Sequence, residues 1–204
     1  MAQIQNVDYQ AIPSHARQMR SLGKDLNREV SSAYTSAKNM HQSWYGTRYN
    51  ELITQFNDSV SLINEMLQLV VTDIPVTLEK VANNYSQADK GSNATAVGTD
   101  QPTKLSNIPL VSDVGMKFIS SQVETTRNNV SNNFKNAKEK MNSISSEFNR
   151  VNWSSEAADA FRTKFNSLKS KIDSNFNEIQ QNFTKLMRQA QEDIEKAESS
   201  NTVQ

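Results

Sequence analysis

Residues 43–70 read SWYGTRYNELITQFNDSVSLINEMLQLV, a turn-like start followed by a long segment with regularly spaced apolar residues. The chain has two tryptophans, and a shift of 109 positions places Trp153 on Trp44. Six of the twenty positions from Trp44 to Ile63 then coincide, where chance gives about one or two. The sequence therefore indicates that the chain contains two copies of one structural unit. The matched pairs are Trp44/Trp153, Thr54/Thr163, Phe56/Phe165, Asn57/Asn166, Ser61/Ser170 and Ile63/Ile172.

The apolar spacing after each tryptophan predicts one long helix. Ten inward positions follow Trp44 in steps of three or four residues, and the shift of 109 gives ten counterparts after Trp153. The mean step, about 3.67 residues per turn, favours nearly straight helices. Of these twenty positions only Ser59 is polar. The positions are Leu52, Phe56, Ser59, Ile63, Leu67, Val70, Ile74, Leu78, Val81 and Tyr85, and then Phe161, Phe165, Leu168, Ile172, Phe176, Ile179, Phe183, Met187, Ala190 and Ile194.

A second apolar stripe precedes each tryptophan, so each unit is predicted to be a helix, a short turn and a second helix. The best shift for these stripes is 108, which places one extra residue just before Trp153, in a turn that tolerates a change of length. The stripes consist of Leu22, Leu26, Val30, Ala33, Ala37 and Met40, and of Val130, Phe134, Ala137, Met141, Ile144 and Phe148.

The turn motifs are Trp44-Tyr45-Gly46 and Trp153-Ser154-Ser155. An indole covers about 200 Å² of the apolar seam at the open end of a hairpin. We therefore expect Trp44 and Trp153 to be core residues, with direct contact to a partner as the alternative. Gly46 allows a positive φ or a helix start. Because Ser155 is a good helix N-cap but is unsuited to positive φ, either the two turns differ or both positions are N-caps.

Glycine and proline concentrate between residues 91 and 115, which predicts three parts. These are a first hairpin (1–90), a flexible, extended, solvated linker (91–111) and a second hairpin (112–204). The expected fold is all-α, with the hairpins packed as an antiparallel four-helix bundle, a pseudo-dimer within one chain. The linker is just long enough to run the length of the bundle. The same lengths also permit two chains to exchange hairpins, so monomer and swapped dimer both stay open.

Pro75 interrupts the long second helix of the first unit. It is expected to kink the helix or restart it near Asp73, because proline lacks the N–H that a continuous helix needs.

Composition argues against several classes of function. The net charge is zero, and residues 1–90 carry 8 basic and 9 acidic residues, so no nucleic-acid partner is expected. His15 and His41 are isolated and the chain has no cysteine, so we expect no metal, no cofactor and no catalysis. The first residues do not resemble a cleaved signal peptide, and no apolar run is long enough to predict stable membrane insertion.

The repeated helix-turn-helix unit, with Trp44-Tyr45-Gly46 in one turn and Trp153-Ser154-Ser155 in the other, resembles the WXG-type (ESAT-like) proteins of bacterial type VII secretion. The first copy matches the Trp-x-Gly triplet. The second departs from it at Ser155 but has the alanine-rich segment that follows, Glu156 to Phe161. The resemblance implies a secreted, extracellular or cell-surface protein exported without a cleaved signal.

The family carries an export signal, Tyr-x-x-x-Asp or Glu, at the end of its second helix, and here Tyr85 and Asp89 occupy that place. A spacing of four residues puts both side chains on one helical face, where one partner can read them together. The matching positions of the second copy are Ile194 and Glu198, which lack the phenol hydroxyl. The other interpretation is that Tyr85 fills the last core position, and the two roles are compatible.

The sequence therefore favours a non-catalytic substrate or targeting adaptor of a type VII secretion system. The resemblance implies recognition by the system's membrane ATPase, and pairing with another WXG-type protein or with itself. The alternatives are a helical scaffold or partner-binding domain that shares only the hairpin, and a membrane-active helical toxin. The host target or cargo, and the choice between effector and chaperone, are left open.

Overall fold

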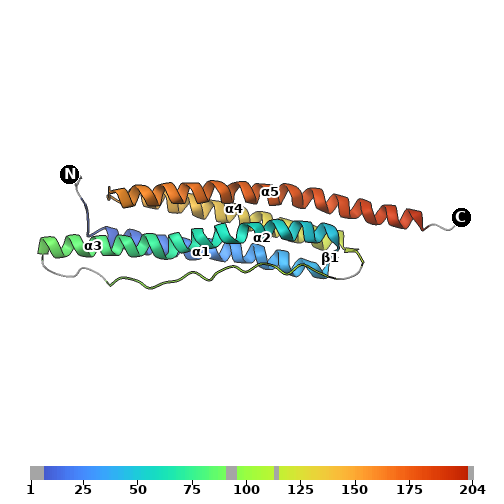
Figure 1. Ribbon diagram of the computed structural model, residues 1–204, viewed down its shortest axis with the longest axis horizontal. Coiled ribbons are helices and arrows are strands. Elements are labelled where there is room, and N and C mark those ends of the chain that lie inside the picture. Colours follow the sequence, from blue (N-terminus) through green and yellow to red (C-terminus); the bar gives the residue numbers. More distant parts are fainter. Residues whose placement is uncertain (1–6, 91–95, 113–114, 202–204) are drawn as a thin grey trace.

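The computed structural model describes residues 7–90, 96–112 and 115–201. Its helices confirm the all-α prediction (Figure 1). The elements are α1 (Ile12–Asn39), the 3-10 turn η1 (Met40–Gln42), β1 (Trp44–Tyr45), α2 (Thr47–Gln68), the π-helical turn η2 (Leu69–Asp73), α3 (Ile74–Lys90), β2 (Lys117–Phe118), α4 (Ser120–Arg150) and α5 (Glu156–Ser200).

The helices lie side by side in an elongated molecule, as Figure 1 shows. The first hairpin comprises α1 and the rod formed by α2, η2 and α3, and the second comprises α4 and α5. Between hairpins, α1 packs on α4 and α2 packs on α5. Both of these pairs run antiparallel, as their ion pairs show: His15–Glu147 and Lys140–Asp25 join α1 to α4, while Arg48–Asp193 and Lys164–Glu65 join α2 to α5.

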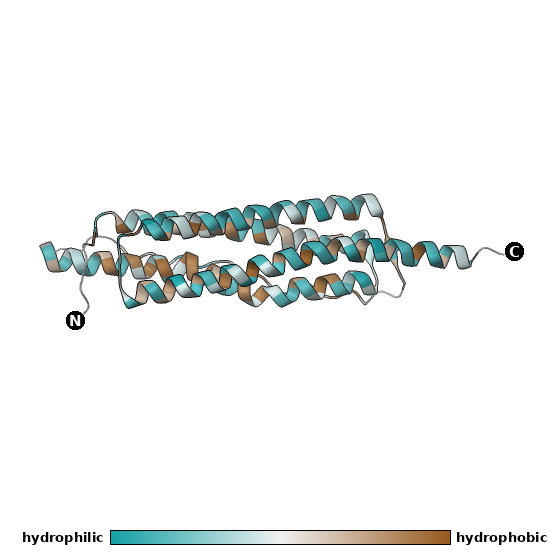
Figure 2. Cartoon of the chain, turned by 90° about the horizontal axis from the view of Figure 1, so that it is seen from above, coloured by the Kyte–Doolittle hydropathy of each residue, from teal (hydrophilic) through white to brown (hydrophobic). Residues whose placement is uncertain are grey.

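The core follows the predicted stripes. Of the twenty inward positions, sixteen are buried, and the other four, Val81, Tyr85, Phe161 and Ile194, are half-buried. Phe134 of α4 stacks on Phe176 of α5 with ring centroids 3.9 Å apart, and it also lies 5.8 Å from Phe56 of α2. Apolar and polar bands alternate along each helix in Figure 2, as expected of helices that bury one face.

Pro75 is accommodated by the π-helical turn η2, so the second helix restarts close to Asp73, as predicted. The N–H of Ile74 donates to the carbonyl of Leu69, five residues earlier, instead of four. The rod formed by α2, η2 and α3 nevertheless continues without a sharp bend (Figure 1). Gly23 of α1 lies against this turn, where an added Cβ would be 2.8 Å from Cγ2 of Val71.

The described part of the linker, residues 96–112, is called the strap below. It is extended and lies along the side of α1 and α2 that faces away from α4 and α5 (Figure 1). The expectation of a solvated linker needs correction for these residues, because Ile108 is buried and Leu105 and Val111 pack on the core. Residues 91–95 of the predicted linker lie outside the described residues.

Two short strands, which the sequence did not predict, follow the strap and close the fold. Trp44 pairs with Phe118 and Tyr45 with Lys117 in an antiparallel ladder between β1 and β2. Each strand has two residues, too few to produce a recognisable alternation of apolar and polar residues. The ladder holds the start of α4 beside the turn of the first hairpin.

Candidate functional site

The predicted signal residues lie one turn apart on the last two turns of α3. Tyr85 is half-buried and Asp89 is exposed. The helix brings both to one face, as their spacing of four residues requires. This end of α3 extends beyond the start of α5, so the pair lies at one extremity of the molecule (Figure 1).

Tyr9, which precedes α1, is a third member of this site. Its hydroxyl donates to Oδ2 of Asp89 at 2.5 Å. A partner that binds Asp89 must therefore share the carboxylate with Tyr9 or displace it. Tyr9 was not predicted, because it lies 80 residues from Asp89 and outside the apolar stripes.

The Trp44 turn lies at the opposite end of the first hairpin, and its indole is 1% exposed. The ring contacts Tyr49 of α2 and Phe118 of β2 edge-on, at centroid distances of 6.1 and 5.6 Å. It also stacks on Phe183 of α5 at 6.1 Å. Trp44 is thus a core residue that joins the two hairpins.

Trp153 is also a core residue, but its turn has a different backbone. Trp153 is 6% exposed, and its carbonyl accepts from Arg162 at 3.4 Å. Gly46 has φ +118° and Ser155 has φ −164°, yet the two residues are the N-caps of α2 and α5. The hydroxyl of Ser155 accepts from the N–H of Ala158 at 3.1 Å. The sequence left open whether the two turns differ or both positions are N-caps. In the structure the turns differ and both positions are N-caps.

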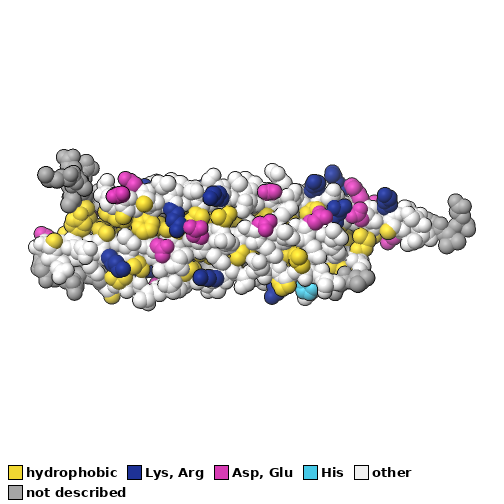
Figure 3. Space-filling model, in the orientation of Figure 1, with side chains coloured by type: hydrophobic (Ala, Val, Ile, Leu, Met, Phe, Trp, Pro, Cys, Tyr) yellow, Lys and Arg dark blue, Asp and Glu magenta, His cyan; other side chains and the backbone are white. Residues whose placement is uncertain are grey.

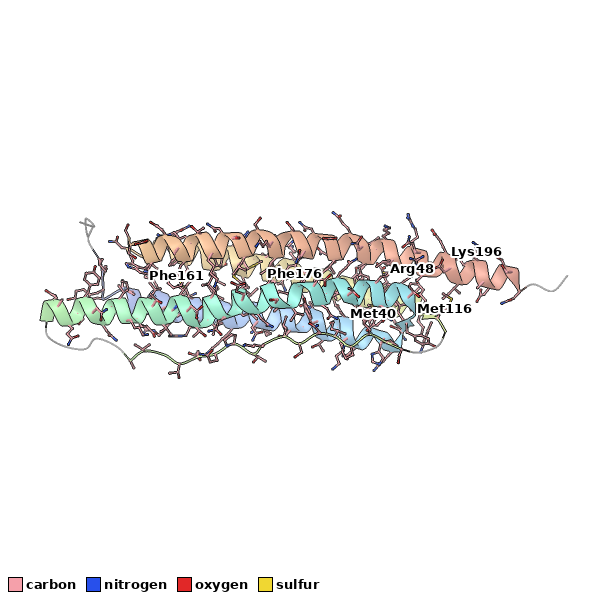
Figure 4. All side chains as sticks on the ribbon, in the orientation of Figure 1. Met40, Arg48, Met116, Phe161, Phe176 and Lys196 are labelled. Carbon is pink, nitrogen blue, oxygen red and sulfur yellow. The ribbon has the colours of Figure 1, made fainter. Side chains whose placement is uncertain are left out.

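A cavity of about 450 Å³ opens beside the Trp44 turn. Its lining includes the apolar side chains of Trp44, Met116 and Phe118, and also Arg48 and Asp193, which form an ion pair at 3.2 Å. Ile194, the counterpart of Tyr85, lines it, whereas Glu198 is exposed further along α5. Figure 4 shows Arg48 and Met116 at this end, from which the part of α5 that carries Lys196 projects. The cavity could accept an apolar side chain of a partner.

The signal end and the Trp44 turn are thus separate candidate sites at opposite ends of the first hairpin. On the face shown in Figure 3, basic and acidic side chains are mixed along the molecule. Within residues 7–90, 96–112 and 115–201, no three His, Cys, Asp or Glu side chains are grouped closely enough to hold a metal ion. The same residues include no helix with the length and apolarity needed to cross a membrane.

Comparison of the chain with protein-family models, with curated proteins and with solved structures finds no match. The function is therefore inferred from the site geometry and from the resemblance of the two turn motifs.

Proposed function

We propose that the chain is a non-catalytic substrate or targeting adaptor of a bacterial type VII secretion system, exported without a cleaved signal. One observation carries the proposal: Tyr85 and Asp89 lie one turn apart at the end of the helix that follows the Trp44 turn. This is where the WXG-type proteins that the chain resembles carry their export signal. The proposed reader is the membrane ATPase of the system.

The packing of the two hairpins supports a finer proposal about the fold. We propose an antiparallel four-helix bundle in which the second hairpin takes the place of a separate WXG-type partner. The opposed directions of α1 and α4, and of α2 and α5, support this pseudo-dimer, as does the stacking of Trp44 on Phe183. The first hairpin would then supply the signal, and the second hairpin would cover the apolar face of the first.

Recognition at the signal end would use the half-buried phenol of Tyr85 and the exposed carboxylate of Asp89. The hydroxyl of Tyr9 already donates a hydrogen bond to Oδ2 of Asp89. A carboxylate can accept several hydrogen bonds, so Oδ1 can still receive a donor from the partner. Tyr9 would then hold the Asp89 side chain in one orientation.

The test is export from a bacterium that encodes the chain and a type VII system. Tyr85→Ala and Asp89→Ala should each lower the amount in the culture supernatant at least tenfold at unchanged cellular levels. Ile194→Ala and Glu198→Ala alter the corresponding positions of the second copy and serve as matched controls. Equal export of all four variants, or absence of the parent chain from the supernatant, would contradict the proposal. Circular dichroism of each purified variant checks that it is folded.

A helical partner-binding domain without an export signal is the second candidate. The cavity beside Trp44 favours it, together with the exposed apolar side chains of Met116 and Ile119, which are 49% and 37% exposed. In that case the parent chain would be absent from the supernatant, or Tyr85→Ala would leave its amount there unchanged, and Met116→Ser would weaken association with the partner. The export assay and a binding assay with the same variants therefore separate the two candidates.

A further inference from the structure

The strap is held by three asparagines of α2 that are spaced seven residues apart: Asn50, Asn57 and Asn64. Each side-chain amide makes two hydrogen bonds to a single strap residue, donating to its carbonyl and accepting from its N–H. The donated bonds measure 2.8, 2.9 and 2.9 Å, to Val111, Ile108 and Leu105 respectively. The accepted bonds from the same residues measure 3.0, 2.7 and 2.8 Å. We call these three asparagines the Asn ladder.

The spacing of the Asn ladder matches the spacing of the strap. Seven residues of α-helix rise about 10.5 Å, and three residues of extended chain rise about 9 to 10 Å. A heptad on α2 thus meets every third residue of the strap, which runs antiparallel to it. The asparagines bind backbone groups of the strap and not its side chains. The arrangement therefore requires only that residues 105, 108 and 111 each have a backbone N–H.

An amide side chain can both donate and accept in this arrangement, whereas an ionised carboxylate has no donor. At the positions of α5 that correspond by the shift of 109, the second copy has Asp159, Asn166 and Asp173. The Asn ladder is therefore a feature of the first hairpin and not of the repeated unit.

An ionic cluster with the buried pair of Arg20 and Glu79 at its centre anchors the start of the strap. Glu79 of α3 forms two hydrogen bonds with the guanidinium of Arg20, one of them at 2.8 Å, and accepts from the N–H of Gly98 at 2.7 Å. Asp100 pairs with Lys24 at 2.8 Å and with Arg20 at 3.5 Å. A Cβ added at Gly98 would lie 2.6 Å from Cζ of Arg20, so the strap crosses directly over the guanidinium.

The strap contributes little apolar burial. Ile108 is 5% exposed, whereas Leu105 and Val111 are only half-buried and Leu110 is 54% exposed. The inward positions of α2, by contrast, form a continuous buried core. Segments with few buried apolar contacts and with solvent-accessible hydrogen bonds open more readily than the core.

We propose that the strap is a releasable cover over the outer face of the first hairpin. It opens as one unit while the helices stay folded, and the Asn ladder sets how often it opens. Opening uncovers the contact site of Ile108 on the side of α1 and α2 opposite to the second hairpin (Figure 1). The ionic cluster around Glu79 and the β1–β2 ladder hold the two ends nearby, so the open strap can close again quickly.

Residue-resolved amide hydrogen exchange of the full-length chain tests the proposal. The amides of Leu105, Ile108 and Val111 should be protected with one common opening constant. That constant should be at least a hundredfold larger than the opening constant of the core amides of α2. Exchange of the strap amides at the rate of global unfolding would overturn the proposal. The unmodified chain provides this result without any variant.

Asn57→Asp is the variant of choice, because it retains the shape and the acceptor but replaces the donor to Ile108 with a charged carboxylate oxygen that repels the carbonyl. Loss of one such hydrogen bond should raise the opening constant about tenfold. We expect the same increase at Leu105 and Val111, and none in the helices. The matched control is Asn166→Asp, at the exposed counterpart position on α5. A change confined to Ile108, or equal changes in variant and control, would overturn the unit opening.

Discussion

At the scale of single residues, the two turns show how a repeat diverges. Gly46 and Ser155 occupy the same position, but Gly46 has φ +118° and ψ −175°, a conformation that only glycine adopts easily. An added Cβ would meet no atom outside the neighbouring residues closer than 3.5 Å, so the cost of a side chain there is conformational and not steric.

We therefore expect Gly46→Ser to lower the free energy of unfolding by about 1 to 3 kcal/mol, although serine is the residue in the second copy. The reciprocal change, Ser155→Gly, should cost only a few tenths of a kcal/mol, roughly the usual difference between these N-caps. Urea unfolding followed by circular dichroism measures both. Equal losses would show that the backbone at Gly46 does not demand glycine.

The buried pair of Arg20 and Glu79 makes stability depend on pH. Glu79 is 3% exposed. Burial raises the pKa of its carboxyl, but hydrogen bonds from Arg20 and Gly98 and nearby positive charge outweigh this effect and leave the pKa below its ordinary value. Because the unfolded state then binds the proton more tightly, the stabilisation is present above about pH 4.3 and is lost as the pH falls through the folded-state pKa.

Glu79→Gln should accordingly lower the free energy of unfolding by about 3 kcal/mol at neutral pH, because Arg20 loses its buried counter-charge. The difference from the parent chain should shrink as the pH falls from about 4.3 through the lowered pKa of folded Glu79, because the folded parent then loses the same charge. Denaturant titrations of the variant and the parent chain, at neutral and at acidic pH, measure this difference. Glu65→Gln is the control, because its pair with Lys164 is exposed and should contribute little. If the difference in the free energy of unfolding does not change with pH, the stabilisation does not come from the charge of Glu79.

At the scale of elements, the contact between α1 and η2 depends on Gly23. A Cβ there would lie 2.8 Å from Cγ2 of Val71 and 3.1 Å from Cγ2 of Val70. Alanine gains about 1 kcal/mol of helix propensity over glycine, but overpacking costs about 1 to 3 kcal/mol. Gly23→Ala should therefore be destabilising in the parent chain. In a Val71→Ala background its cost should fall by about 1 kcal/mol or more, since the nearest clash is gone. Additive effects in a double-mutant cycle would refute the steric explanation.

The helices could be predicted from the sequence because their signal is local and repeated. The apolar steps of three and four residues located the buried faces, and Pro75 located the irregular turn. The Asn ladder is visible in the sequence only as asparagines seven residues apart. Its meaning depends on the register between α2 and the strap, which is set by tertiary packing and not by any local pattern.

The same distinction applies to the candidate site. The proximity of Tyr85 and Asp89 follows from helical geometry alone, and so it was predictable. The contact of Tyr9 with Asp89 joins the segment before α1 to the end of α3. No periodicity links these segments, and only the folded chain brings them together.

At the scale of the whole molecule, each hairpin completes the aromatic core of the other. Phe134 lies between Phe176 of its own hairpin and Phe56 of the first. Trp44 stacks on Phe183 across the same interface. A hairpin that lost its neighbour would expose these rings to water, at a cost of about 25 cal/mol for each Å² of apolar surface. Neither hairpin is therefore expected to stay folded when the other unfolds.

Each hairpin carries its own tryptophan, which makes this coupling measurable. Trp153→Phe leaves Trp44 as the reporter of the first hairpin and of its contact with Phe183, and Trp44→Phe leaves Trp153 as the reporter of the second hairpin. Within each variant, the fluorescence midpoint in urea should coincide with the midpoint from circular dichroism, because both hairpins unfold in one cooperative transition. A fluorescence transition that precedes the loss of helix in either variant would mean that one hairpin unfolds alone, so that the shared aromatic core does not couple them.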